Sequence, residues 1–173
     1  ARKDFGLNNS NKPVKLDEVD RKILFFLQAN SRIPYHEIGK ELKIAASTVH
    51  NRVKKMISSG VIRRFAAIVD PQVLGLLVSW LGINVEPDKL ESVVTDLAKY
   101  EEIQIIGTSY GDHDILIQVI SKNPKELSEF IRHKIKPIPG IKEVPGVHSS
   151  IFTEIHKIVN WVPLHEGMKF NTK

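Results

Sequence analysis

The sequence of 173 residues contains no cysteine, and aromatic residues make up only 7% of it. Without cysteine the chain has no disulfide framework, no cysteine nucleophile and no thiolate zinc site. Aromatic residues this sparse do not form a platform on which nucleic-acid bases stack. No hydrophobic run approaches the roughly 20 residues that a transmembrane helix needs, and residues 1–15 lack the apolar core of a secretory signal. We therefore expect a cytoplasmic protein with no membrane partner.

Motifs of common enzyme classes are missing as well. The sequence has no Walker-type phosphate loop, no Gly-x-Ser-x-Gly, no His-Glu-x-x-His and no dinucleotide-binding fingerprint. His113 stands between Asp112 and Asp114, but this arrangement lacks the spacing of metal ligands. We therefore predict no catalytic residue, no metal site and no cofactor.

Charged residues are plentiful and unevenly distributed. The chain has 25 Lys and Arg against 20 Asp and Glu, which gives a net charge of +5. Residues 1–67 hold 14 of the basic residues and 6 of the acidic ones, so the remainder of the chain is slightly acidic. This division suggests two modules, of which the first faces a polyanion. The alternative is that surface lysines are scattered unevenly without a functional reason.

Residues 16–60 show the periodicity of three short helices. Asp17 is placed to cap the first, which is expected to end near Ala29, and Pro34 suits the first turn of the second. Gly60 is expected to end the third helix as its C′ residue. Two helices joined by a tight turn, the second rich in polar and basic residues, are typical of a helix-turn-helix that places its second helix in the major groove of DNA.

The third helix carries the candidate DNA contacts. Four of its side chains suit hydrogen bonding to base edges or phosphates, and three suit phosphate anchoring. For any single residue an ordinary solvated helix face is the alternative. The predicted DNA-binding residues are Ser47, Thr48, His50 and Asn51 in the first group and Arg52, Lys54 and Lys55 in the second.

Beyond residue 60 the pattern changes to strands. A strand is expected over 61–69, followed by a break at Asp70-Pro71 and then by the order β-α-β-β-α-β. This order is the split βαβ, or ferredoxin-like, arrangement. Its strands are expected at 78–85, 103–109, 115–120 and 144–152, with helices that open at Pro87 and at Asn123-Pro124.

In this order the two halves resemble the Lrp/AsnC (feast/famine) family of transcriptional regulators over roughly Leu16 to Thr153. The first half carries the resemblance in residues 16–24, Glu37-Ile38, residues 49–56 and Gly60-Val61-Ile62; the second carries it in Gly107, residues 111–114, Leu127, Phe130 and Pro139-Gly140-Ile141. The resemblance implies an α+β chain with a winged-type helix-turn-helix domain followed by a ferredoxin-like RAM domain. Where the family usually has serine this chain has Ala45, so we expect the third helix to begin at Ala46 or Ser47.

The expected organisation has five parts. They are a flexible basic arm (1–15), a helix-turn-helix domain (16–62), a linker strand and hinge (63–77), the RAM domain (78–153) and a C-terminal tail (154–173). Basic residues of the arm, namely Arg2, Lys3, Lys12 and Lys15, could add non-specific phosphate contacts.

The turn over residues 110–114 is the most suggestive feature of the second half. Glycine lets the backbone approach a carboxylate, and an acidic side chain can pair with an α-ammonium group. A polar hairpin turn without a ligand is the alternative. By the family resemblance, small effectors, usually amino acids, bind near this turn with help from the fourth strand, and the implied residues are Tyr110, Gly111, Asp112, Asp114, Ser149, Ser150 and Thr153.

A sheet covered by helices on one face leaves its other face to be buried, and dimerisation is the simplest solution. The resemblance implies homodimers that assemble to higher even oligomers, commonly octamers. We therefore predict a sequence-specific regulator that binds double-stranded DNA and responds to a small effector, expected to be an amino acid. The alternatives are a sirohaem decarboxylase-like enzyme on the same scaffold, suggested by Ile62-Arg63-Arg64, and an architectural DNA binder without an effector.

Overall fold

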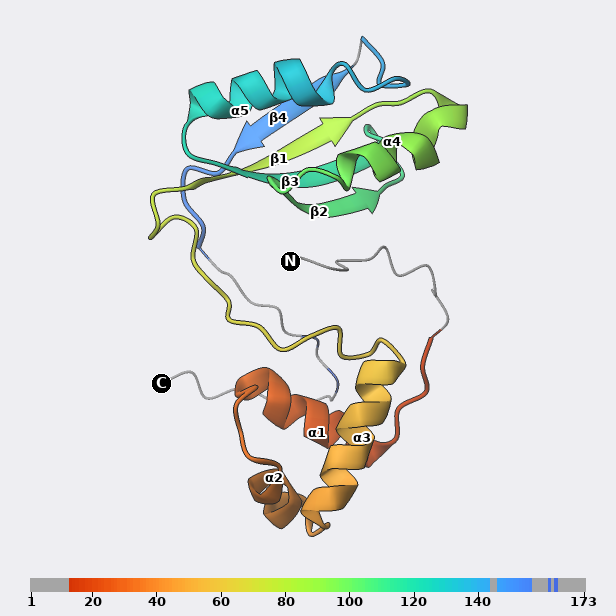
Figure 1. The fold of residues 1–173 in the computed structure, drawn as a ribbon, viewed down its shortest axis with the longest axis vertical. Coiled ribbons are helices and arrows are strands. Elements are labelled where there is room, and N and C mark those ends of the chain that lie inside the picture. Colours follow the sequence, from red (N-terminus) through yellow and green to blue (C-terminus); the bar gives the residue numbers. More distant parts are fainter. Residues whose placement is uncertain (1–12, 144–145, 157–161, 163, 165–173) are drawn as a thin grey trace. The chain divides into compact units, whose positions relative to one another are not determined.

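The computed structural model describes residues 13–143, 146–156, 162 and 164, and the chain divides into two compact units (Figure 1). The first unit extends to Ile68 and includes Val162 and Leu164 from the C-terminal part, and the second begins at Val69. Arg2, Lys3 and Lys12 of the expected basic arm lie outside the described residues. Across the part of the chain that is described, none of the helices combines the length and apolar character needed to cross a membrane.

The first unit contains three helices, α1 (Glu18–Ala29), α2 (Tyr35–Leu42) and α3 (Ala46–Ser58). Asp17 caps α1 as predicted, and the cap is reciprocal: the Asp20 backbone N–H donates to Asp17 Oδ1 at 2.7 Å, and the Asp17 N–H donates to Asp20 Oδ2 at 3.3 Å. Such a capping box satisfies two of the backbone donors that a helix start leaves free. Pro34 stands one residue earlier than predicted, as the residue before α2.

The helix α3 begins at Ala46, one of the two predicted positions, and its N-cap Ala45 makes no side-chain hydrogen bond. Gly60 follows the C-cap Ser59 with a φ of 76°, so the predicted C′ glycine is confirmed. The turn between α2 and α3 is tight because Gly39 allows it: a Cβ there would lie 2.6 Å from the Ile44 carbonyl oxygen. Residues of all three helices form the core of the unit, which contains Ile23, Leu24, Leu27, Ile38, Val49, Val53 and Met56.

The strand predicted over 61–69 is wrong. This segment forms no strand, and Phe65, Ile68 and Val69 are 44%, 62% and 59% exposed. A β-strand requires a partner backbone for its hydrogen bonds, and the described part of this chain pairs none with the segment. The run of apolar residues that suggested a strand is therefore not sufficient to form one without a partner strand.

The second unit is a four-stranded antiparallel sheet with the order β2-β3-β1-β4 (Figure 1). In chain order its elements are β1 (Leu77–Ile83), a 3-10 turn (Pro87–Lys89), α4 (Leu90–Leu97), β2 (Ile103–Thr108), β3 (Ile115–Ser121), α5 (Pro124–Phe130), a π-helical turn (Ile131–Ile135) and β4 (Val147–Ile151). Asn123 caps α5 and Pro124 occupies its first turn, as predicted. This is the predicted α+β fold. Val144 and Pro145, at the predicted start of the last strand, lie outside the described residues.

The two faces of this sheet differ. On one face Leu81, Ile83 and Ile117 pack in a buried core with residues of α4 and α5. Because side chains alternate along a strand, the neighbouring residues point to the opposite face, which we call the open face. It carries Trp80, Gly82, Ile105, Leu116, Gln118, Ile120, His148 and Ser150.

Candidate functional site

The exposed surface of α3 is polar and basic, while Val49, Val53 and Met56 anchor the helix in the core. Residues spaced by three, four and seven share one side of a helix, and Ser47, Asn51 and Lys54 have this spacing. Six of the predicted DNA-binding residues are exposed on α3, namely Ser47, Thr48, His50, Asn51, Lys54 and Lys55. The structure therefore offers a continuous hydrogen-bonding and cationic helix surface.

Arg52, the seventh predicted DNA-binding residue, is engaged within the unit. Its Nη1 donates to Asp17 Oδ2 at 2.6 Å and to Asp20 Oδ1 at 2.8 Å. The backbone N–H of Asp20, followed by the Arg52 guanidinium, holds the pKa of the Asp17 carboxyl below its usual value, and the two carboxylates raise the pKa of Arg52. The capping box of α1 thus doubles as an anchor for α3. The sequence did not predict this contact because Arg52 lies on α3, whereas Asp17 and Asp20 lie at the start of α1.

The loop between β2 and β3 is held by hydrogen bonds at both ends. The Ser109 hydroxyl donates to the His113 carbonyl at 2.6 Å, and the Val85 backbone N–H donates to Asp114 Oδ2 at 2.9 Å. One carboxylate oxygen of Asp114 is therefore occupied by a hydrogen bond that holds the loop in place. Asp112 and Tyr110 have exposed side chains, and Gly111 has a φ of 138° that favours glycine.

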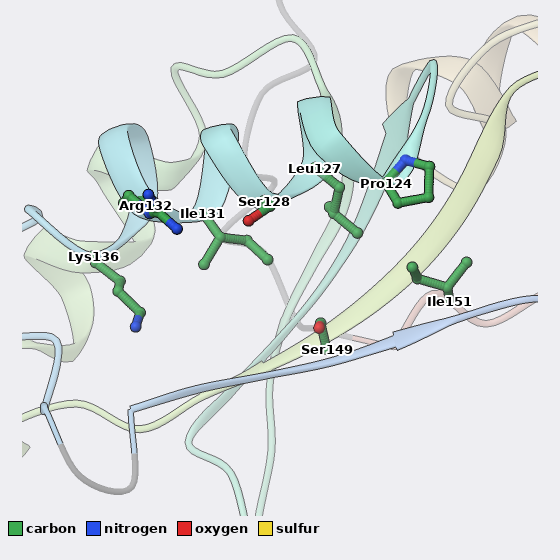
Figure 2. A pocket seen from close by; sticks show the side chains of 8 residues that line it. All are labelled: Pro124, Leu127, Ser128, Ile131, Arg132, Lys136, Ser149 and Ile151. Atoms are coloured by element: carbon green, nitrogen blue, oxygen red, sulfur yellow. The ribbon is translucent and has the colours of Figure 1, made fainter.

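A groove of about 250 Å³ runs between β4 and the helical segment that begins with α5 (Figure 2). Figure 2 shows Ser149 pointing from β4 toward the helix and Lys136 pointing from the helix end toward β4. Leu127, Ile131 and Ile151 supply an apolar lining. Among the described residues Arg132 and Lys136 have no acidic partner at ion-pair distance. Two free cations beside a hydroxyl and an apolar wall suit a small carboxylate with an apolar side chain.

The structure divides the predicted effector residues among four places. Tyr110, Gly111, Asp112 and Asp114 lie in the β2–β3 loop, whereas Ser149 lines the groove at β4, on the far side of β1. Ser150 pairs with Trp80 and faces the open side of the sheet, and Thr153 follows the end of β4. One chain therefore does not bring these residues together. Sequence reasoning missed Ser128, Arg132 and Lys136, although their spacing of four residues could have revealed a shared helix side.

Both halves of the chain match known protein families. The winged helix-turn-helix DNA-binding family matches residues 16–63, and the Lrp/AsnC ligand-binding domain matches residues 80–161. The HTH-type transcriptional regulator FL11 of Pyrococcus abyssi is 40% identical over 152 residues, which cover 87% of this chain and 98% of that protein.

Solved structures show the same fold. The structure of Escherichia coli AsnC has a TM-score of 0.76 at 25% identity and covers 87% of this chain and 100% of its own. A transcriptional regulator from Neisseria meningitidis, crystallised as a complex with L-Met, has a TM-score of 0.76 at 24% identity and covers 87% of this chain and 97% of its own. With a DNA-binding domain, a ligand-binding domain and relatives of nearly its full length, the chain belongs to the Lrp/AsnC family of DNA-binding transcriptional regulators.

Proposed function

We propose that this protein is a sequence-specific regulator that binds double-stranded DNA through α3 and changes its assembly or DNA affinity when an amino acid binds to the second unit. The observation that carries the proposal is the pairing, on one chain, of an exposed polar and basic α3 surface with a Lrp/AsnC ligand-binding domain. The proposal includes that the protein regulates transcription rather than catalysing a reaction, and that it works in the cytoplasm.

Within α3 we assign different tasks to different residues. Ser47, Thr48, His50 and Asn51 approach base edges or nearby phosphates, and Lys54 and Lys55 contact phosphates. Arg52 positions α3 through Asp17 and Asp20, since its Nη1 is already engaged by both carboxylates. Asn is suited to bidentate recognition of adenine, and each such pair is worth about 1–3 kcal/mol of discrimination.

DNA binding is tested by retaining genomic DNA fragments on the purified protein at near-physiological salt. Asn51→Ala is expected to weaken binding to the retained fragments much more than binding to random DNA, because it removes a base contact. Lys54→Ala, on the same helix, is the matched comparison and should weaken both about equally, because phosphate contacts carry no sequence information. Uniform, salt-sensitive retention of all fragments would instead indicate an architectural DNA binder.

For the effector we propose a site completed by assembly. The groove at β4 supplies Arg132, Lys136 and Ser149 for an α-carboxylate, and the β2–β3 loop of another copy supplies Asp112 for an α-ammonium group. Ser150, on the open face, and Thr153, just after β4, stay assigned to the effector by the family resemblance, although neither lines the groove. The half-exposed open face and the apolar residues of the unpaired segment 61–69 support assembly through homodimers, which we propose associate into higher even oligomers.

Effector binding is tested by calorimetric titration with single amino acids, beginning with L-Met because a protein of the same fold was crystallised with it. Asp112→Ala and Arg132→Ala are each expected to weaken binding at least tenfold. Lys125→Ala is the matched control, since Lys125 is an exposed cation of α5 that does not line the groove. A response that persists unchanged in both Asp112→Ala and Arg132→Ala would move the effector site elsewhere.

A further inference from the structure

Two imidazoles lie beside each other on the open face of the sheet. His113 stands just before β3, and His148 lies on β4, where it pairs directly with Gly82 of β1. Their ring centroids are 5.2 Å apart and the ring planes are tilted by 37°. The two residues are distant in the sequence, so no spacing motif reveals the pair.

Gly82 makes this arrangement possible. A Cβ at residue 82 would lie 2.1 Å from His113 Cδ2 and 2.5 Å from His113 Nε2. The His113 ring therefore rests directly on the backbone of β1, and any side chain at residue 82 would displace it. A glycine inside a strand commonly marks such a close approach.

The hydrogen bonds of Asn84 fix the proton of His113. Asn84 Nδ2 donates to the Asp112 carbonyl at 2.9 Å, so the amide atom that faces His113 Nδ1, also at 2.9 Å, is the oxygen. Because a carboxamide oxygen only accepts, Nδ1 carries the hydrogen, and the neutral ring keeps its lone pair on Nε2. A histidine whose second nitrogen donates to a fixed acceptor has the orientation that metal-ligating histidines show.

We propose that His113 and His148 bind one divalent ion of a first-row transition metal, of the class of zinc, nickel and copper. Metal–nitrogen distances of about 2.0–2.1 Å place the ring centres of two imidazoles on one tetrahedral ion about 5 Å apart, in agreement with the observed separation. Neutral imidazole suits these metals, whereas magnesium and calcium prefer oxygen ligands.

The described part of this chain supplies two ligands to the ion. Across the described residues no group of three or more histidine or acidic side chains is placed to hold a metal. With two ligands from these residues, the site differs from a closed structural zinc site with four protein ligands. The site belongs to the second unit and α3 to the first, so the metal titration does not use the residues proposed to bind DNA.

The alternative is that His113 has a purely structural role. This role would explain its hydrogen bond to Asn84 but would not involve His148. The two interpretations therefore differ most clearly at His148, which is an exposed residue of an edge strand. Its replacement by alanine removes one ligand and leaves the core of the unit untouched.

Calorimetric titration of the full, tag-free and chelator-treated chain with Zn²⁺ tests the proposal. We expect one ion per chain and at least a tenfold loss of affinity in both His148→Ala and His113→Ala. Asn84→Ala keeps both ligands but releases the orientation of His113, and a loss of about 10–100-fold is expected. The matched control is His133→Ala, an exposed histidine of the π-helical turn, which should bind like the original chain. No saturable binding, or unchanged affinity in His148→Ala, overturns the proposal.

A second readout uses Trp80, which lies on the same open face two residues before Gly82. In a Trp161→Phe background Trp80 is the single tryptophan of the chain. Cu²⁺ is expected to quench its fluorescence saturably at one ion per chain, and this quenching should disappear in His148→Ala while persisting in His133→Ala. Equal quenching in both variants contradicts a site at His113 and His148.

Discussion

The two units of this chain differ in how completely each covers its own apolar surface. Three helices of the first unit bury Ile23, Ile38 and Val49 fully and present a polar surface on α3. The second unit buries one face of its sheet under α4 and α5, while Ile105 on the open face stays 47% exposed. The three helices of the first unit therefore enclose a core between them, whereas the second unit leaves one face of its sheet partly exposed. We thus propose that DNA contact belongs to the first unit and that the open face of the second takes part in assembly.

The largest expected effect comes from removing buried side chains of either unit. Ile38 and Ile117 are both 0% exposed, one in each core. Replacement by alanine is expected to lower the free energy of unfolding by about 2–5 kcal/mol in each case. Hydrogen exchange should show the loss of protection only in the unit that carries the substitution. If Ile38→Ala weakens protection in β3 as strongly as in α1, the units are one cooperative block and the comparison fails.

The next effect tests whether the open face needs a cover. Ile105→Asp places a charge on that face and is expected to shift a dimer toward monomer by at least tenfold in the dissociation constant, because a desolvated, unpaired charge is costly. Sedimentation velocity measures the shift. Ile57→Asp is the matched control, since Ile57 is an isoleucine of the first unit with nearly the same exposure, 46%. Dissociation by both variants, or by neither, would show that the open face is not what distinguishes the units.

The elements themselves were largely predictable from the sequence because their signals are local. Asp17 and Asn123 mark helix starts because their side chains accept hydrogen bonds from the backbone N–H three residues later. Gly60 marks the end of α3 because glycine readily adopts the positive φ found there. The strand over 61–69 was predicted wrongly because strand formation depends on a partner that no local pattern contains. For the same reason the sequence did not predict that Val162 and Leu164, near the C-terminus, belong to the first unit.

The candidate sites were less predictable than the fold. The exposure of Ser47 and Asn51 follows from helical periodicity, and the structure confirms that they are exposed. The engagement of Arg52 by Asp17, and the approach of His148 to His113, depend on how separate elements pack. Periodicity tells which side of an element a residue occupies but not which residue of another element it meets.

A smaller effect concerns the acid stability of the first unit. The hydrogen bond from the Asp20 backbone, followed by the bond from Arg52, holds the pKa of Asp17 below its ordinary value of 3.8. A carboxyl group with a lowered pKa in the folded state stabilises that state above the ordinary pKa, and the contribution is lost as the pH falls through the lowered value. Asp17→Asn is therefore expected to lower the urea midpoint at pH 7, with a difference from the original chain that shrinks below about pH 4.

Urea titrations at pH 7 and pH 3 measure this difference. Asp88→Asn serves as the control, since Asp88 is an exposed carboxylate of the second unit beside Lys89. It should leave the unfolding of the first unit unchanged at both pH values. A gap between Asp17→Asn and the original chain that is as wide at pH 3 as at pH 7 would contradict a contribution from the ionised Asp17.

The smallest expected effect lies at the end of the first unit. Gln28 of α1 holds Val162 by two hydrogen bonds: the Val162 N–H donates to Oε1 at 2.7 Å, and Nε2 donates to the Val162 carbonyl at 3.2 Å. Both bonds are exposed, so Gln28→Ala should cost no more than about 1 kcal/mol, with faster proteolysis near residue 162 as the sensitive measurement. Gln104→Ala, which loses only a local bond to Glu101 in the second unit, is the control. Because Leu164 packs against the same core, faster cleavage in Gln28→Ala alone would mean that the first unit completes its core with residues from the far end of the chain.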